Sequence, residues 1–271
     1  MGDARAKRAI KYRMSQPLVA IGICMEKYHE PEFFSNFYSI RKVKGTPVIR
    51  VIEARTDQAR NKIVREFLEL PDEFERLLFL DSDQVFPPDI IGRLLTHHKL
   101  VVGGLYFHRQ SPFQPHVYKW NYKHPTPEGD PTLTHISVSR GDRRLIQCDA
   151  IGTGALMVAR EVFSDIIKEP WFQYGGQWDS EDITFCRKLA KAQVPIYCDL
   201  GCECGHISRF IVGRETYLQE RERMMKESGG TADSDGRVAV VADGSEDGDE
   251  GEAEAQEECA EGGAEEGVLS V

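Results

Sequence analysis

The sequence predicts an α/β fold in which helices flank a mostly parallel sheet. Apolar runs without charged residues alternate with segments whose apolar residues recur at helical spacing, and this alternation occurs four times along the chain. Uncharged apolar runs are typical of strands buried on both faces, as in parallel sheets. Strand–helix alternation is in turn typical of a doubly wound sheet. The predicted strands cover residues 18–24, 47–52, 77–80 and 100–104.

Helices are predicted between these strands. Pro31 leads in a helix over residues 31–43, because proline is favoured in the first helical turn. Thr56 is placed to cap the next helix, and Pro88 starts a third. Apolar residues recur at helical spacing in all three, as in Phe33 and Phe37, Ile63 and Phe67, and Ile90 and Leu94.

The composition changes after Tyr106. Residues 106–147 are rich in proline, histidine and aromatic residues and contain short alternating runs, which predict a small antiparallel excursion beside the main sheet. The chain then returns to the main fold. The expected elements are a strand entering a helix over residues 151–163, a helix after Ser180, a strand over residues 195–200 and a charged helix over about 214–227.

Charge divides the chain into three parts. Residues 1–16 form a basic arm, and residues 229–271 hold 14 acidic residues and one basic residue, Arg237. The tail has few apolar residues, so we expect it to be disordered. The net charge of −10 comes from this tail, because the first 228 residues hold 33 basic and 30 acidic residues. Residues 17–228 are therefore expected to form the folded domain.

Several features favour a cytoplasmic protein. The sequence has no run of 18 apolar residues, so we expect no membrane span. The basic N-terminus is not followed by a long apolar segment, which argues against a secretory signal. The seven cysteines are an odd number without the regular spacing of a disulfide framework, which favours free thiols in a reducing compartment.

Two carboxylates follow the apolar run at residues 77–80. Side chains alternate faces along a strand, so Asp81 and Asp83 are expected to point the same way. They would lie at the carboxyl end of the sheet, where α/β proteins bind ligands. Paired carboxylates there suit a hard divalent cation with a phosphate behind it. The alternative is an acidic turn, because Asp and Ser are turn formers and two prolines follow.

Two later segments also carry residues suited to chemistry. Gly-Thr-Gly at residues 152–154 allows a close backbone approach, although a simple tight turn would use the same residues. Ser-Glu-Asp at residues 180–182 starts a helix. Capping and the helix dipole alone would favour such residues. We prefer a functional interpretation because Trp178 and two glycines precede them in a shaped loop.

In this order, these motifs resemble those of GT-A glycosyltransferases, which have a Rossmann-like fold. Asp81-Ser82-Asp83 resembles the metal-binding Asp-x-Asp motif, residues 152–154 the glycine loop near the acceptor, and residues 180–182 the x-Glu-Asp motif. His206 resembles the C-terminal metal histidine. The phrases LLFLDSDQVFPPD, AIGTGALMVAREVF and SEDITFCRKL resemble small GT-A enzymes of bacteriophages and bacteria. The resemblance covers about residues 17–210.

The resemblance implies transfer of a sugar from a UDP- or GDP-sugar to an acceptor, with inversion and with Mn²⁺ or Mg²⁺ as cofactor. The acceptor would be a protein, a glycan or a modified nucleic acid, in the host cytoplasm if the protein is phage-encoded. The implied catalytic residue is Asp182, supported by Glu181. The implied donor-binding residues are Arg55, Arg60, Asn61, Asp81 and Ser82, the metal ligands Asp81, Asp83 and His206, and the acceptor-binding residues Gly152, Thr153, Gly154 and Trp178.

Three alternatives remain open. A nucleotidyltransferase also places metal-binding carboxylates on an α/β sheet, although the histidine and the Ser-Glu-Asp motif fit it less well. The chain could also bind a nucleotide sugar or a glycan without catalysing a reaction. Finally, Cys202, Cys204 and His206 alternate and could share one face of an extended segment, where they could bind a structural zinc ion.

Overall fold

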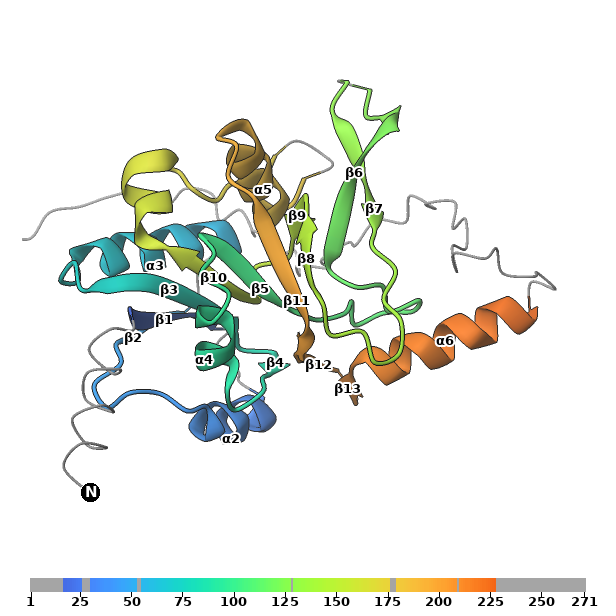
Figure 1. The fold of residues 1–271 in the computed structure, drawn as a ribbon, viewed down its shortest axis with the longest axis horizontal. Helices are drawn as coiled ribbons and strands as arrows, with labels where there is room; N and C mark the ends of the chain where they lie inside the picture. The colour runs from blue at the N-terminus through green and yellow to red at the C-terminus, as the bar shows by residue number, and fades with distance from the viewer. Residues whose placement is uncertain are drawn as a thin grey trace, which may run out of the picture.

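The computed structural model has a seven-stranded central sheet with helices on both faces (Figure 1). This confirms the predicted α/β class with a mostly parallel sheet. The basic arm and the acidic tail lie outside the residues that the structure describes. Those residues are 17–25, 30–52, 55–127, 129–175, 179–208 and 210–227.

The strands of the central sheet lie in the order β2-β1-β3-β10-β5-β11-β8. β10 and β8 run against the direction shared by the other five. The bounds are β1 Leu18–Met25, β2 Val48–Ile52, β3 Phe74–Asp81, β5 Val101–Leu105, β8 Leu145–Cys148, β10 Ala155–Ala159 and β11 Ile196–Glu203.

The antiparallel direction of β10 has a local consequence. β10 lies between β3 and β5 and pairs with both. An antiparallel strand begins at the edge of the sheet where its parallel neighbours end. The loop at residues 152–154, which precedes β10, therefore lies beside the end of β3. The backbone N–H of Asp81 donates to the carbonyl of Gly154 at 3.0 Å.

Two hydrophobic cores cover the two faces of the sheet. α3 (Thr56–Glu69), α5 (Glu181–Lys191) and the π-helix η1 (Val162–Ile166) pack on one face. α2 (Pro31–Ser39) and α4 (Ile90–Leu95) pack on the other, below β1 and β3 in Figure 1. Alternate residues of β3 belong to the two cores, with Leu77 and Phe79 on the α3 side. The same alternation directs Asp81 toward α3 and α5.

Two small antiparallel sheets complete the fold. β6 (Val117–Pro125) and β7 (Pro131–His135) lie in the predicted excursion and form a sheet with β9 (Ala150–Ile151), which lies just beyond it, whereas β8, at the end of the predicted range, joins the central sheet. β4 (Gln84–Val85), β12 (Gly205–Ile207) and β13 (Ile211–Val212) form a sheet that the sequence did not predict. In this sheet His206 is directly opposite Gln84, so a segment far along the chain is held beside the end of β3.

Some predicted boundaries were wrong. α2 ends at Ser39, short of residue 43, because Ile40 is extended and its side chain is buried in the core. Thr56 is the first residue of α3, and Arg55 occupies the N-cap position. β3 ends at Asp81, and Asp83 lies in the turn before β4.

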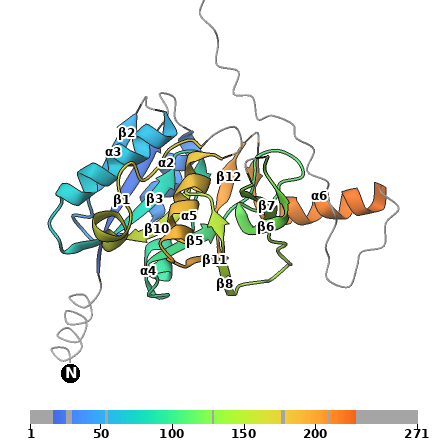
Figure 2. The ribbon, with the colours of Figure 1, turned by 90° about the horizontal axis from the view of Figure 1, so that it is seen from above.

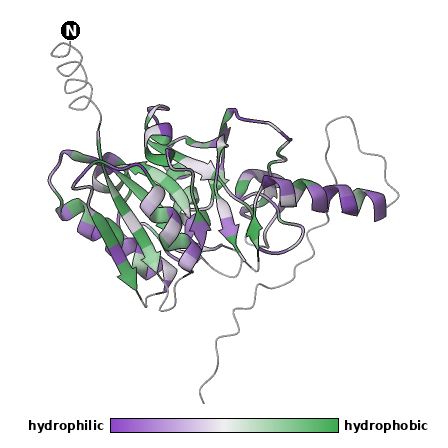
Figure 3. Cartoon of the chain, turned by 90° about the horizontal axis from the view of Figure 1, so that it is seen from below, coloured by the Kyte–Doolittle hydropathy of each residue, from purple (hydrophilic) through white to green (hydrophobic). Residues whose placement is uncertain are grey.

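The last described helix is α6 (Arg214–Glu227), which projects away from the sheet in Figures 1 and 2. It is hydrophilic along its length, as Figure 3 shows, in contrast to the hydrophobic strands of the sheet. Arg214 and Tyr217 are its buried residues. None of the helices in the described ranges is long and apolar enough to cross a membrane.

Candidate active site

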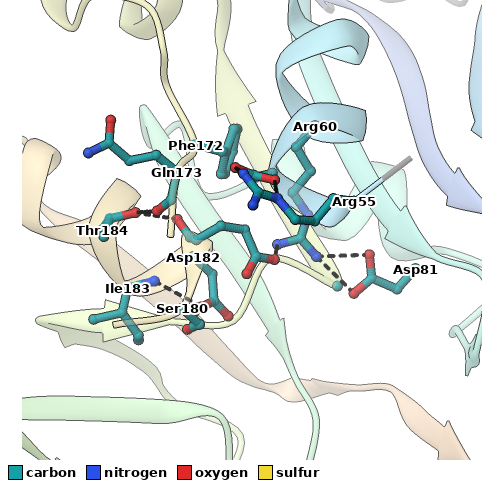
Figure 4. Close-up of polar contacts among 12 residues, drawn as sticks. Arg55, Arg60, Asp81, Phe172, Gln173, Ser180, Asp182, Ile183 and Thr184 are labelled. Atoms are coloured by element: carbon teal, nitrogen blue, oxygen red, sulfur yellow. Dashed lines mark hydrogen bonds and ion pairs between the residues drawn. The ribbon is translucent and has the colours of Figure 1, made fainter. Parts of the chain in front are cut away.

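A buried arginine connects two of the predicted motifs. Arg60, on α3, donates to Glu181 Oε1 at 2.7 Å and to both carboxylate oxygens of Asp81 at 3.1 Å. Figure 4 shows Arg60 reaching Asp81 beside the start of α5. The arginine side chain is only 4% exposed. Burial alone would lower the pKa of Arg60, but the charges of Asp81 and Glu181 hold it well above its usual value. Arg60 is thus a fixed cation between two acids.

The two acids bound to Arg60 are themselves poorly solvated. Burial raises the pKa of Asp81 against the opposing charge of Arg60, and the neighbouring charge of Asp83 adds to the rise. Burial likewise raises the pKa of Glu181 against Arg60, and Asp182 adds to it. Such perturbed acids gather at functional sites more often than elsewhere in a protein.

Asp83 has different partners from Asp81. Its Oδ2 lies 3.2 Å from His206 Nε2 and 3.4 Å from a guanidinium nitrogen of Arg109. β3 ends at Asp81, and Asp83 lies in the turn that follows, so the alternation of a strand does not extend to Asp83. Burial would raise the pKa of Asp83, but His206 and Arg109 outweigh it and lower that pKa.

The contact between Asp83 and His206 fits a bound cation. His206 Nδ1 donates to the carbonyl of Phe107 at 2.7 Å, so Nδ1 carries the hydrogen. His206 Nε2 then either carries a second proton, which it donates to Asp83, or keeps a lone pair, in which case a cation would have to lie between Nε2 and the carboxylate oxygen. Two ligands at right angles on Mg²⁺ lie about 3.0 Å apart, close to the observed spacing. Asp83 Oδ1 is also buried without a hydrogen-bond partner in the described structure.

The expected three-residue metal set is not assembled. Within the described ranges, no three His, Cys, Asp or Glu side chains gather where they could hold a metal ion. Asp81 is held by Arg60, which leaves Asp83 and His206 as the pair suited to a cation. Magnesium sites commonly use one or two protein carboxylates together with substrate phosphates, so a two-residue site is compatible with such an ion.

The glycines at 152 and 154 lie against neighbouring side chains. A Cβ on Gly152 would lie 1.9 Å from the Tyr106 hydroxyl, and a Cβ on Gly154 would lie 2.1 Å from Gln84 Nε2. The Gly154 N–H donates to the Tyr106 hydroxyl at 3.3 Å. Tyr106, which the sequence did not single out, therefore holds this loop against the end of β3.

Asp182 lies at the same edge, on the first turn of α5. Ile183 N–H donates to its Oδ1 at 2.8 Å, and the Ser180 hydroxyl also donates to Oδ1. No hydrogen bond in the described structure uses its Oδ2. Asp182 is half-buried, whereas Glu181 is buried against Arg60. Of the two predicted acids, Asp182 is thus the more accessible.

The remaining predicted donor residues have other partners. Arg55 is exposed and bonds Asp57 through two nitrogens, at 2.7 and 2.8 Å. Asn61 uses all the capacity of its amide: it donates to the carbonyls of Asp57 and Phe172 and accepts from the N–H groups of Trp171 and Phe172. These contacts make Asn61 an anchor for that loop and give no support to donor binding. Ser82 is buried, and Trp178 lies outside the described residues.

The cysteines near His206 give no support to the zinc alternative. Cys202 and Cys204 are fully buried, and Cys204 Sγ contacts the carbonyl of Cys202 at 3.8 Å. The Nδ1 atom of His206 is already bonded to Phe107. These residues do not form a metal-binding group among those that the structure describes.

A cluster of stacked rings supports His206 from the excursion. His108 stacks on His116 with ring centroids 3.6 Å apart, and His116 stacks on Tyr106 at 4.6 Å. The hydroxyl of Tyr118 hydrogen-bonds His108 and His116 at 3.1 and 3.2 Å. Tyr106 meets His206 edge-on. The sequence signal was the richness of residues 106–147 in histidine and aromatics, but it did not show that these rings stack together.

This cluster predicts an acid-labile fold. Burial, with the charges of His135 and His206, lowers the pKa of His108 to about 4, and burial lowers that of His135. An unfolded histidine titrates near pH 6.5, so between about pH 6.5 and 4 the unfolded chain binds more protons. We expect the free energy of unfolding to fall across this range, by up to about 1.4 kcal/mol per pH unit for each histidine. Urea titrations at a series of pH values measure it.

A substitution isolates the histidine contribution to this loss. His108→Phe keeps a ring on His116 but removes one titrating group, so stability should fall less steeply with acid. The raised pKa values of Asp81 and Glu181 act in the opposite direction, and their effect is common to both proteins. His124→Gln, at an exposed position, is the control. Identical slopes for His108→Phe and the wild type would contradict the prediction.

Comparison with known proteins supports the fold and gives no information about the chemistry of the site. No family model and no curated protein matches the chain. Among solved structures, the chain is similar to the crystal structure of A197 from STIV, with 17% sequence identity and a TM-score of 0.50. The match covers 70% of this chain and 86% of A197. At this identity the likeness concerns the fold alone, and it supports the mixed α/β architecture described above.

Proposed function

We propose that the chain is a metal-dependent glycosyltransferase that transfers a sugar from a UDP- or GDP-sugar to an acceptor, with inversion. The observation that carries the proposal is that motifs far apart in the sequence lie together in the structure. Arg60 bonds Glu181 across 121 residues of sequence, and His206 contacts Asp83 across 123. All four motifs that resemble those of GT-A enzymes thus meet at one edge of the sheet, where α/β proteins bind ligands.

The chemistry of the reaction suits these groups. Departure of a nucleoside diphosphate places negative charge on its phosphates, and a divalent ion bound to Asp83 and His206 would neutralise it. Arg109, which is half exposed and pairs with Asp83, would approach a phosphate from the excursion. Arg60 holds Glu181 and Asp81 in place, and Asp182 is left to accept a proton from the acceptor. Tyr106 positions the Gly-Thr-Gly loop near them.

The proposal is tested by metal-dependent binding. Calorimetry and thermal shift with UDP, GDP, UDP-glucose, UDP-N-acetylglucosamine and GDP-mannose should show binding with Mn²⁺ or Mg²⁺ and none with chelator. We expect Asp83→Ala to abolish it, because the substitution removes the carboxylate that faces His206. Asp89→Ala, at a half-exposed aspartate before α4, is the matched control. Equal affinity with and without chelator would contradict a metal-dependent site.

The product of turnover separates the proposal from its alternatives. Release of UDP or GDP supports a glycosyltransferase. Release of pyrophosphate from a nucleoside triphosphate and a sugar phosphate would indicate a nucleotidyltransferase. Metal-dependent binding without turnover, across protein, glycan and DNA acceptors, would indicate a binding module.

A further inference from the structure

Gln84 is a buried residue whose amide has no partner. It is only 1% exposed, and neither its Nε2 nor its Oε1 makes a hydrogen bond to any described residue. The hydroxyl of Thr153, which is fully buried, is unpartnered too. Buried polar groups in folded proteins are nearly always hydrogen-bonded, so each exception needs a cause. Thr153 directly precedes Gly154, and a Cβ on Gly154 would lie 2.1 Å from Gln84 Nε2, so the two residues lie on neighbouring segments.

The position of Gln84 places this unpaired amide inside the candidate site. Gln84 is directly opposite His206 in the small sheet, and opposed residues of an antiparallel pair project to the same face. A Cβ on Gly154 would meet both Gln84 Nε2, at 2.1 Å, and Asp81 Oδ2, at 2.8 Å. The amide therefore lies between the Asp81 end of the site and His206, against the loop that carries Thr153.

The chemistry of the unpaired atoms selects among ligands. A cation would take the amide oxygen but leave the two N–H groups unpaired. A phosphate oxygen would take the N–H groups but offer no hydrogen to the amide oxygen. A hydroxyl both donates and accepts, and two neighbouring hydroxyls satisfy both ends of an amide. The hydroxyl of Thr153 has the same dual character.

We propose that Gln84, assisted by Thr153, binds hydroxyl groups of the donor's sugar and thereby determines which sugar is accepted. The proposal rests on the glycosyltransferase function above. The sugar would then lie between Asp81 and the pair Asp83 and His206. The phosphates of the donor would lie next to it. The terminal torsion of glutamine is soft, so a small rotation turns the amide toward the ligand.

Gln84→Met tests the proposal, because methionine has a similar length and no amide. Three measurements are compared with the wild type: melting temperature without nucleotide, affinity for UDP or GDP with Mn²⁺, and affinity for the sugar nucleotide that binds the wild type best. We expect an unchanged or raised melting temperature, since an unpaired buried amide is removed. We expect unchanged affinity for the free nucleotide and a loss of about tenfold or more for the sugar nucleotide. Gln219→Met, on the exposed face of α6, is the control.

Each other outcome overturns a definite part of the reasoning. If Gln84→Met fails to fold or melts lower, the amide is structural and satisfied within the fold or by water. If the variant binds the sugar nucleotide like the wild type, or loses the free nucleotide equally, Gln84 does not contact the sugar. In both cases the glycosyltransferase proposal stands. If the wild type binds neither nucleotides nor sugar nucleotides, the proposed function fails, and the role of Gln84 fails with it.

Discussion

Replacing Arg60 with alanine is expected to lower the free energy of unfolding by about 3–5 kcal/mol. The guanidinium is the shared partner of Asp81 and Glu181, at 3.1 and 2.7 Å, and its side chain is 4% exposed. Without it, two poorly solvated carboxylates face each other with no cation between them. Removal of one member of a buried ionic group costs far more than loss of a surface pair, because the remaining charge cannot recover its hydration. Chemical denaturation near pH 7 measures the loss.

Two comparisons show whether the loss comes from the buried charges. Arg65→Ala removes an arginine from the same helix, but its pair with Glu169 is half exposed, so a change of under about 1 kcal/mol is expected. The penalty for Arg60→Ala, relative to the wild type at the same pH, should shrink with acid as Asp81 and Glu181 become protonated. A penalty below about 1 kcal/mol at neutral pH would mean that Arg60 does not hold the site together.

Asp182→Asn is expected to preserve donor binding and to slow transfer by about 10²- to 10⁴-fold. Successive residues of a helix lie about 100° apart around its axis, so Asp182 cannot share the direction of Glu181, which faces Arg60. Its effect as a base depends on its position at the start of α5, where it faces away from Arg60. Asparagine has nearly the same shape and can still accept from Ile183 N–H and Ser180, but it cannot take a proton.

The comparison variant for this experiment is Glu181→Gln, which alters a carboxylate one residue away. We expect a smaller loss of transfer, accompanied by a change in stability, because Glu181 is a partner of Arg60. Steady-state rates and donor affinity are measured for both variants, and NMR of the product reports its anomeric configuration. Near-wild-type transfer by Asp182→Asn, or retention of configuration, would falsify the assignment of Asp182 as the base.

The sequence predicted the strands more reliably than their directions. Apolar runs identify buried strands because both faces must be apolar, and this places β1, β3 and β5 well. A strand in the middle of a sheet is apolar on both faces whether it is parallel or antiparallel. The apolar run that forms β10 therefore does not indicate the direction of the strand. The two-residue strand β4 was too short for any periodicity to be visible.

The sequence predicted which motifs form the candidate site, but not how their side chains bond to one another. Motifs that follow strands could be recognised along the chain, and the structure brings them to one edge. Which groups bond to which could not be foreseen. Arg60 takes Asp81, Asn61 is used up by the backbone of Trp171 and Phe172, and Gln84 is left without a partner. These outcomes depend on packing between elements far apart in the sequence. Local patterns of residues give no information about such packing.

The central place of β10 also bears on how the chain is made. β3 and β5 leave the ribosome first, but β10 is the strand that joins them, and roughly fifty residues separate the end of β5 from its start. At common elongation rates of about 5–20 residues per second, that interval lasts several seconds. Throughout it, β3 and β5 each have an unpaired edge in the newly made chain, and such edges invite pairing with other chains. The nascent protein is therefore most prone to aggregation, and most open to binding by chaperones, while its excursion is being synthesised.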